Sequence, residues 1–107
     1  MAVSRAEFLQ EMLAANPEDT FARYALALEL AKSDQPGGAW EHFDYLLKNH
    51  PQYAATYYQA GMFLLNQGRR EEAKEVFTRG VEVTRRQGNR HAQSELERAL
   101  AELANES

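Results

Sequence analysis

Apolar residues recur every three or four positions along most of the chain, and no segment alternates apolar and polar residues for long. This spacing is typical of α-helices that bury one face, and it gives no support for a β-strand. Ser4 followed by Glu7 has the form of a capping box, so we expect a first helix from there to about Ala15. Its apolar stripe consists of Phe8, Leu9, Met12 and Leu13.

Proline, glycine and capping residues predict where the other helices begin and end. Asn16 is expected to cap a second helix that has Pro17 at its first position and ends near Lys32. The breaker at 33–38 comes before a third helix, which ends near Asn49. The next helices are predicted over about 51–67, 69–86 and 88–104. Because every connection is short, we expect an all-α fold of about six antiparallel helices.

Two stretches of the chain, offset by 34 residues, repeat one pattern of large and small side chains. The second stretch contains Tyr57, Ala60, Gly61, Leu64, Gly68, Ala73 and Phe77, and the matching residues of the first are Arg23, Leu26, Ala27, Leu30, Asp34, Ala39 and Phe43. This 34-residue period resembles the tetratricopeptide repeat (TPR), a helix–turn–helix unit. The resemblance implies that the helices stack into a right-handed α–α superhelix.

The resemblance covers nearly the whole chain as one domain, residues 1–107. It divides into a half repeat at 4–16, repeat one at 17–50, repeat two at 51–84 and a capping helix at 88–104. Three residues depart from the pattern. Arg23 stands where a large aromatic is usual, Asp34 takes the place of the turn glycine, and Arg85 replaces a closing proline.

Composition narrows the functional classes. The chain has no cysteine, which excludes disulfides, thiolate metal sites and thiol catalysis. Its formal net charge of −4 argues against general nucleic-acid binding, which depends on neutralising phosphates. No apolar stretch is long enough for a membrane span or a signal peptide, so we expect a cytoplasmic protein.

The polar residues give no sign of an enzyme. His42, His50 and His91 lie far apart in sequence and do not have the spacing of metal ligands. There is no phosphate-binding loop and no nucleophile motif. The carboxylates of Glu71, Glu72 and Glu75 open a predicted helix and are interpreted as solvated. We therefore expect no catalytic residue, no metal and no cofactor.

The family resemblance implies a groove for a peptide or helix of another protein, lined by the first helix of each pair. Carried over by register, the groove residues are Phe21, Tyr24, Leu28, Tyr58, Met62, Leu65, Asn89 and Leu96. Such a groove is mainly apolar and lacks the basic clamp with which one TPR subgroup binds a C-terminal carboxylate. Two alternatives remain open: Tyr24 and Tyr58 only bridge adjacent helices, or a second copy covers the groove in a homodimer.

Overall fold

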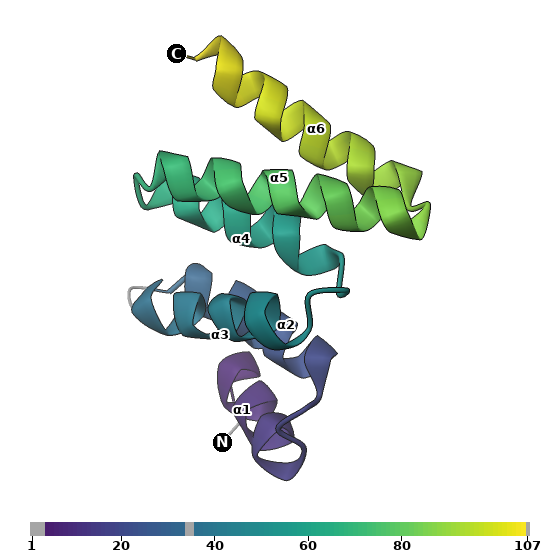
Figure 1. The fold of residues 1–107 in the computed structure, drawn as a ribbon. Helices are drawn as coiled ribbons and strands as arrows, with labels where there is room; N and C mark the ends of the chain where they lie inside the picture. The colour runs from purple at the N-terminus through teal and green to yellow at the C-terminus, as the bar shows by residue number, and fades with distance from the viewer. Residues whose placement is uncertain (1–3, 34–35, 107) are drawn as a thin grey trace. The chain divides into compact units, whose positions relative to one another are not determined.

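The computed structural model describes residues 4–33 and 36–106, which contain six α-helices and no strand (Figure 1). This confirms the predicted all-α fold. The chain divides into two compact units between His50 and Pro51, and each unit is described by itself. The division falls where repeat two is predicted to begin; the repeat boundaries themselves stay a prediction.

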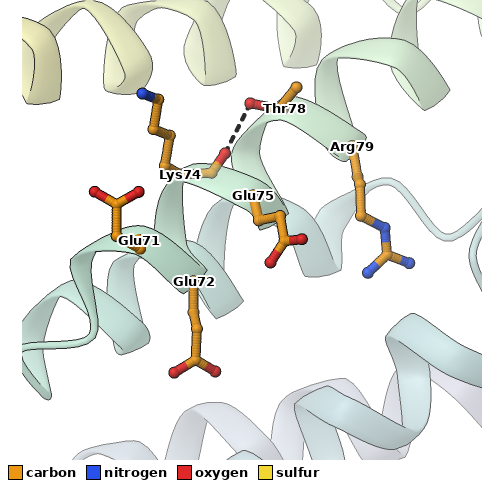
Figure 2. A pocket seen from close by; sticks show the side chains of 6 residues that line it. All are labelled: Glu71, Glu72, Lys74, Glu75, Thr78 and Arg79. Carbon is orange, nitrogen blue, oxygen red and sulfur yellow. Dashed lines mark hydrogen bonds between the residues drawn. The ribbon is translucent and has the colours of Figure 1, made fainter.

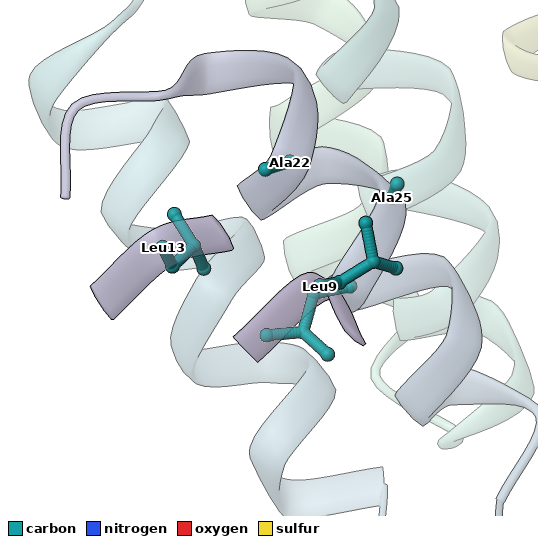
Figure 3. Packing of buried hydrophobic residues seen from close by; sticks show 5 residues of the cluster. Leu9, Leu13, Ala22 and Ala25 are labelled. Carbon is teal, nitrogen blue, oxygen red and sulfur yellow. The ribbon is translucent and has the colours of Figure 1, made fainter. Parts of the chain in front are cut away.

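The first unit contains α1 (Arg5–Ala15), α2 (Thr20–Ala31) and α3 (Pro36–Asn49). Helix α2 packs against both α1 and α3. Leu9 and Leu13 of α1 lie against the alanines of α2, as Figure 3 shows for Ala22 and Ala25. The small side chains of α2 allow α1 to approach closely, so the two leucines of α1 pack directly against α2.

The apolar stripe predicted on α1 divides into a buried and an exposed part. Leu9 and Leu13 are 6% and 9% exposed, whereas Phe8 is 56% and Met12 is 37% exposed. The reason is geometric, since α2 is the only described helix that packs against α1, and one neighbour covers one flank of a helix.

Helix α1 begins as predicted, and α2 does not. Ser4 caps α1 by accepting a hydrogen bond from the backbone N–H of Glu7 at 3.1 Å. The prediction that Asn16 caps α2 is wrong, because Asp19 accepts the capping bond from Ala22 N–H at 2.9 Å. Asn16 instead accepts from the N–H of Glu18, so the segment between the helices is a tight turn.

The second unit contains α4 (Ala55–Asn66), α5 (Arg70–Gln87) and α6 (Arg90–Asn105). Helix α5 packs against α4 and α6. The prediction that Pro51 opens α4 is wrong by four residues, since 51–52 form a turn. Gly68 and Gly88 end α4 and α5 with φ of +74° and +70°, the left-handed conformation that glycine adopts without strain.

The close approach of α4 to α5 depends on glycine. A Cβ added at Gly61 would lie 2.2 Å from Cε1 of Phe77, which is fully buried. A Cβ at Gly80 would lie 2.6 Å from Cβ of Tyr57 and 2.9 Å from Cδ1 of Leu96. Helix α5 continues past Arg85, which replaces the closing proline, and ends at Gln87. Asp34, which takes the place of the turn glycine, lies outside the described residues.

Candidate functional site

Helix α2 presents an apolar face that the first unit leaves partly uncovered. Phe21 is 57% exposed, and Tyr24 and Leu28 are half-buried. These residues are three and four positions apart, so their side chains line one side of the helix. All three were predicted to line a groove, and the structure leaves part of each side chain accessible.

Helix α4 presents an equivalent face in the second unit. Tyr58, Met62 and Leu65 are half-buried at helical spacing. The ring centroid of Tyr58 lies 6.3 Å from that of Phe77, with the planes inclined by 40°. Tyr58 therefore packs partly on the core of its unit, as the bridging alternative expects, and still keeps an accessible part.

Helix α6 does not match the predicted groove. Asn89 is exposed and is the N-cap, accepting from Ala92 N–H at 3.2 Å. Leu96 is only 1% exposed and lies beside Gly80 of α5, so its assignment to an accessible surface is corrected. The 34-residue register with α2 and α4 predicts that Leu96 lies on the accessible face. In α6, however, the stripe of Leu96, Ala99 and Leu103 is buried.

A network of polar side chains surrounds Arg23 in the first unit. The guanidinium carbon lies 3.9 Å from the centroid of the Tyr45 ring, a cation–π contact. Nη2 donates to the carbonyl oxygen of Pro17 at 2.9 Å, and Nη1 donates to Nδ1 of His42 at 3.1 Å. Arg23 stands where the repeat usually has a large aromatic residue. Its guanidinium contacts both α3 and the turn before α2, and so links these two segments to α2.

Glu18 extends this network to the end of α3. Its carboxylate accepts from the Tyr45 hydroxyl at 2.5 Å and lies 2.9 Å from Nε2 of His50. The hydrogen bond from Tyr45, with that of His50, lowers the pKa of Glu18. The same bond to Glu18 raises the pKa of Tyr45, because it favours the neutral phenol. Glu18 is exposed, so the network fixes geometry more than it adds stability.

The second unit contains the same pair of residue types in exchanged positions. Tyr57 stands 34 residues after Arg23, and Arg79 stands 34 residues after Tyr45. The guanidinium of Arg79 lies 6.0 Å from the Tyr57 ring, and the Tyr57 hydroxyl donates to the carbonyl of Pro51 at 2.6 Å. Neither pair was predicted from the sequence. Comparing the two repeats at both positions together would have found the exchange.

One hollow of the second unit is open and lined by α5 alone. Its volume is about 530 Å³, and its lining side chains are Glu71, Glu72, Lys74, Glu75, Thr78 and Arg79. Figure 2 shows the three carboxylates pointing away from one another. Glu72 is paired with Arg69 at 2.5 Å, and this hydrogen bond lowers the pKa of Glu72. These groups form a solvated helix face and do not converge on a ligand.

The described residues contain neither a candidate metal site nor a candidate membrane span. Residues 4–33 and 36–106 contain no group of three or more histidine or acidic side chains placed to hold a metal ion. Within the same ranges no helix has the length and apolar character needed to cross a membrane.

Comparison with known proteins identifies the fold. The sequence matches no protein-family model and no curated protein. The crystal structure of a tetratricopeptide repeat domain protein from Salinibacter ruber is 35% identical, with a TM-score of 0.76. The match covers 82% of this chain and 98% of that one.

Two solution structures are similar as well. A tetratricopeptide repeat domain protein from Salinibacter ruber is 36% identical over 82% of this chain and 89% of that one, with a TM-score of 0.78. A protein from Bordetella parapertussis is 27% identical over 98% of this chain and 91% of that one, with a TM-score of 0.83. The chain therefore belongs to the tetratricopeptide repeat family.

Proposed function

We propose that this protein is a non-enzymatic interaction module that binds an apolar segment of another protein. The binding residues are the matched faces of α2 and α4. The observation that carries the proposal is that both faces keep large apolar side chains accessible, two of them at equivalent repeat positions. On α2 these are Phe21, Tyr24 and Leu28, and on α4 they are Tyr58, Met62 and Leu65.

The chemistry of these faces fits a protein partner. Aromatic residues and methionine are enriched at protein interfaces, where they bury much area and adapt to the partner's shape. Phe21 supports this use most strongly, because a phenylalanine that is 57% exposed contributes little to folding. Neither face carries lysine or arginine, so the partner segment is expected to be apolar and not an acidic chain end.

The two faces also repeat one another. Tyr24 and Tyr58 occupy the same position of the 34-residue period, and so do Leu28 and Met62. An apolar partner segment would meet similar chemistry on either helix. This repetition supports recognition of an extended or helical segment over that of a small molecule.

The test is co-precipitation from a cell extract with wild type and with the double variant Tyr58→Arg, Met62→Arg. The control is Thr78→Arg, Ser94→Arg, which adds the same charge at exposed positions of α5 and α6. We expect a partner that wild type and control retain and the α4 variant loses at unchanged helicity. Retention by all three proteins would refute the proposal.

Self-assembly is the alternative outcome of this experiment. If a second copy covers the α2 and α4 faces, light scattering of wild type will give a mass that rises with concentration. The α4 variant will then be monomeric. A monomer across the measured range excludes this alternative.

A further inference from the structure

Two histidines of the first unit belong to the polar network around Arg23, and protonation affects their contacts in opposite ways. His42 lies on α3, and its Nδ1 accepts the hydrogen bond that Nη1 of Arg23 donates at 3.1 Å. Arginine is a donor only, so Nδ1 must be unprotonated and the proton of the neutral ring must lie on Nε2. A protonated His42 has no free nitrogen lone pair and cannot accept this bond.

The charges that face His42 favour its neutral form. Burial, and then the guanidinium of Arg23 on α2, lower the pKa of His42, and Glu41 on α3 opposes them with a smaller effect. When His42 is protonated, the hydrogen bond between α2 and α3 is lost and two cations stand side by side. Acid therefore weakens this contact.

His50, one residue after the end of α3, has the opposite surroundings. Its Nε2 lies 2.9 Å from Oε2 of Glu18 in the turn before α2, and the pair is ionic only when His50 is protonated. Tyr45 of α3 also faces His50, with ring centroids 6.1 Å apart, and its hydroxyl donates to the same carboxylate. This hydrogen bond, and then the one with His50, lower the pKa of Glu18, so the carboxylate stays charged in mild acid. Acid therefore strengthens this second contact.

We propose that the two contacts form a pH-dependent switch in the way that α2 and the turn before it are joined to α3. At neutral pH the hydrogen bond from Arg23 to His42 contributes to the connection. In mild acid this bond is lost, and the ion pair between Glu18 and His50 takes over. The turn stays attached to α3 at either pH, so acid shifts α2 locally without unfolding the unit. The switch does not depend on the α2 and α4 faces, and it goes beyond the proposed function.

Nuclear magnetic resonance of the isotopically labelled full chain tests the first contact. The ring-nitrogen shifts of His42 should show the proton on Nε2 at neutral pH. On acidification His42 should titrate below its ordinary value of 6.5, and the guanidinium signal of Arg23 should change with the same midpoint. Arg23→Met should raise the midpoint of His42, because it removes the neighbouring cation. His91, exposed on α6, is the internal control, and its midpoint should not move.

Double-mutant cycles then compare the two contacts by urea denaturation, at neutral pH and at a pH below both measured histidine midpoints. One cycle combines Arg23→Met with His42→Leu, and the other combines Glu18→Ala with His50→Ala. We expect the coupling between Arg23 and His42 to be lost or reversed in acid, and the coupling between Glu18 and His50 to increase. If the four residues only pack together, neither coupling will change with pH.

Four results would overturn the inference. They are a proton on Nδ1 of His42 at neutral pH, a His42 midpoint at or above 6.5, an Arg23 signal that does not follow His42, and a coupling that is independent of pH in either cycle. The helicity of each variant is checked by circular dichroism. The first three results come from the wild-type chain, so the test does not require that any variant folds.

Discussion

The guanidinium of Arg23 lies 3.9 Å over the ring of Tyr45 and joins the two helices of the first complete repeat. One period later Tyr57 and Arg79 form a looser pair with the residue types exchanged, and the guanidinium lies 6.0 Å from the ring. Arg23 and Tyr57 also donate to the carbonyl of the proline six residues before each of them. Arg23 and Tyr57, which occupy the same repeat position, thus both hold the turn before their helix through a hydrogen bond to its proline.

This exchange predicts that the first unit tolerates the swap Arg23→Tyr, Tyr45→Arg better than either substitution alone. Each single change leaves two like residues in contact and should cost about 1 kcal/mol of unfolding free energy, the scale of a partly exposed cation–π contact. The double variant should recover at least half of the summed loss. Urea denaturation followed by circular dichroism measures all four proteins. Strictly additive losses would show that the two residues do not interact.

The contact of Gly61 with Phe77 predicts a large effect from one added methyl group. Gly61→Ala should destabilise the second unit by about 1–3 kcal/mol, because the added Cβ would overlap the ring of Phe77, which is fully buried. Gly37→Ala is the matched control, since no atom lies within 4 Å of a Cβ at that helical position. The control should change the stability little, because a Cβ added at Gly37 meets no other atom and the residue lies in the first turn of α3. Equal effects in the two variants would contradict the packing described for α4 and α5.

A pH dependence is expected from His42. Burial, and then the charge of Arg23, lower the pKa of His42 below its ordinary value of 6.5. The folded state therefore binds fewer protons than the unfolded state between the two pKa values. Stability is full above about pH 6.5, falls as the pH decreases through that value and stops falling below the folded pKa.

The variant His42→Gln removes this titration. Urea denaturation at about pH 8 and about pH 5 should show a smaller loss of stability on acidification for the variant than for wild type. His91→Gln, at an exposed position of α6, is the control and should behave like wild type. If His42→Gln loses as much stability as wild type over this range, His42 is not the group responsible.

The corrected start of α2 also has a measurable consequence. Asp19→Ala should cost about 1 kcal/mol, because it leaves the N–H of Ala22 without its capping partner. Asp19→Asn keeps an acceptor in place and should cost much less. If the two variants are equally destabilised, the helix does not depend on this cap. Thermal unfolding of the purified variants is sufficient for the comparison.

Local signals in the sequence predicted most of the fold. Ser4 with Glu7, Gly68 and Gly88 act within a few residues of their own position, so their roles could be read directly. The start of α2 was misplaced because Asn16 and Asp19 are both good capping residues, and the structure uses the second as the cap. The sequence alone does not indicate which of two nearby capping residues caps the helix.

Features that depend on tertiary contacts were harder to predict. Arg23 meets Tyr45 across a turn, so nothing near Arg23 in sequence indicates its partner. Leu96 was wrongly assigned to the groove because the register of α2 and α4 was applied to the last helix. The side of that helix that is buried depends on its packing against α5. The exposure of Phe8 and Met12 likewise depends on which neighbours α1 has, and an apolar stripe does not specify them.

The central claim is that the α2 and α4 faces bind another protein, and photo-crosslinking tests it most directly. A photoreactive phenylalanine analogue placed at Tyr58 is compared with the same analogue at Thr78, an exposed residue of α5. After irradiation in a cell extract, mass spectrometry identifies what each position has captured. We predict crosslinks from position 58 to an apolar segment of a different protein and none to that segment from position 78. Crosslinks from position 58 to a second copy of this chain alone, or the same products from both positions, would contradict the account.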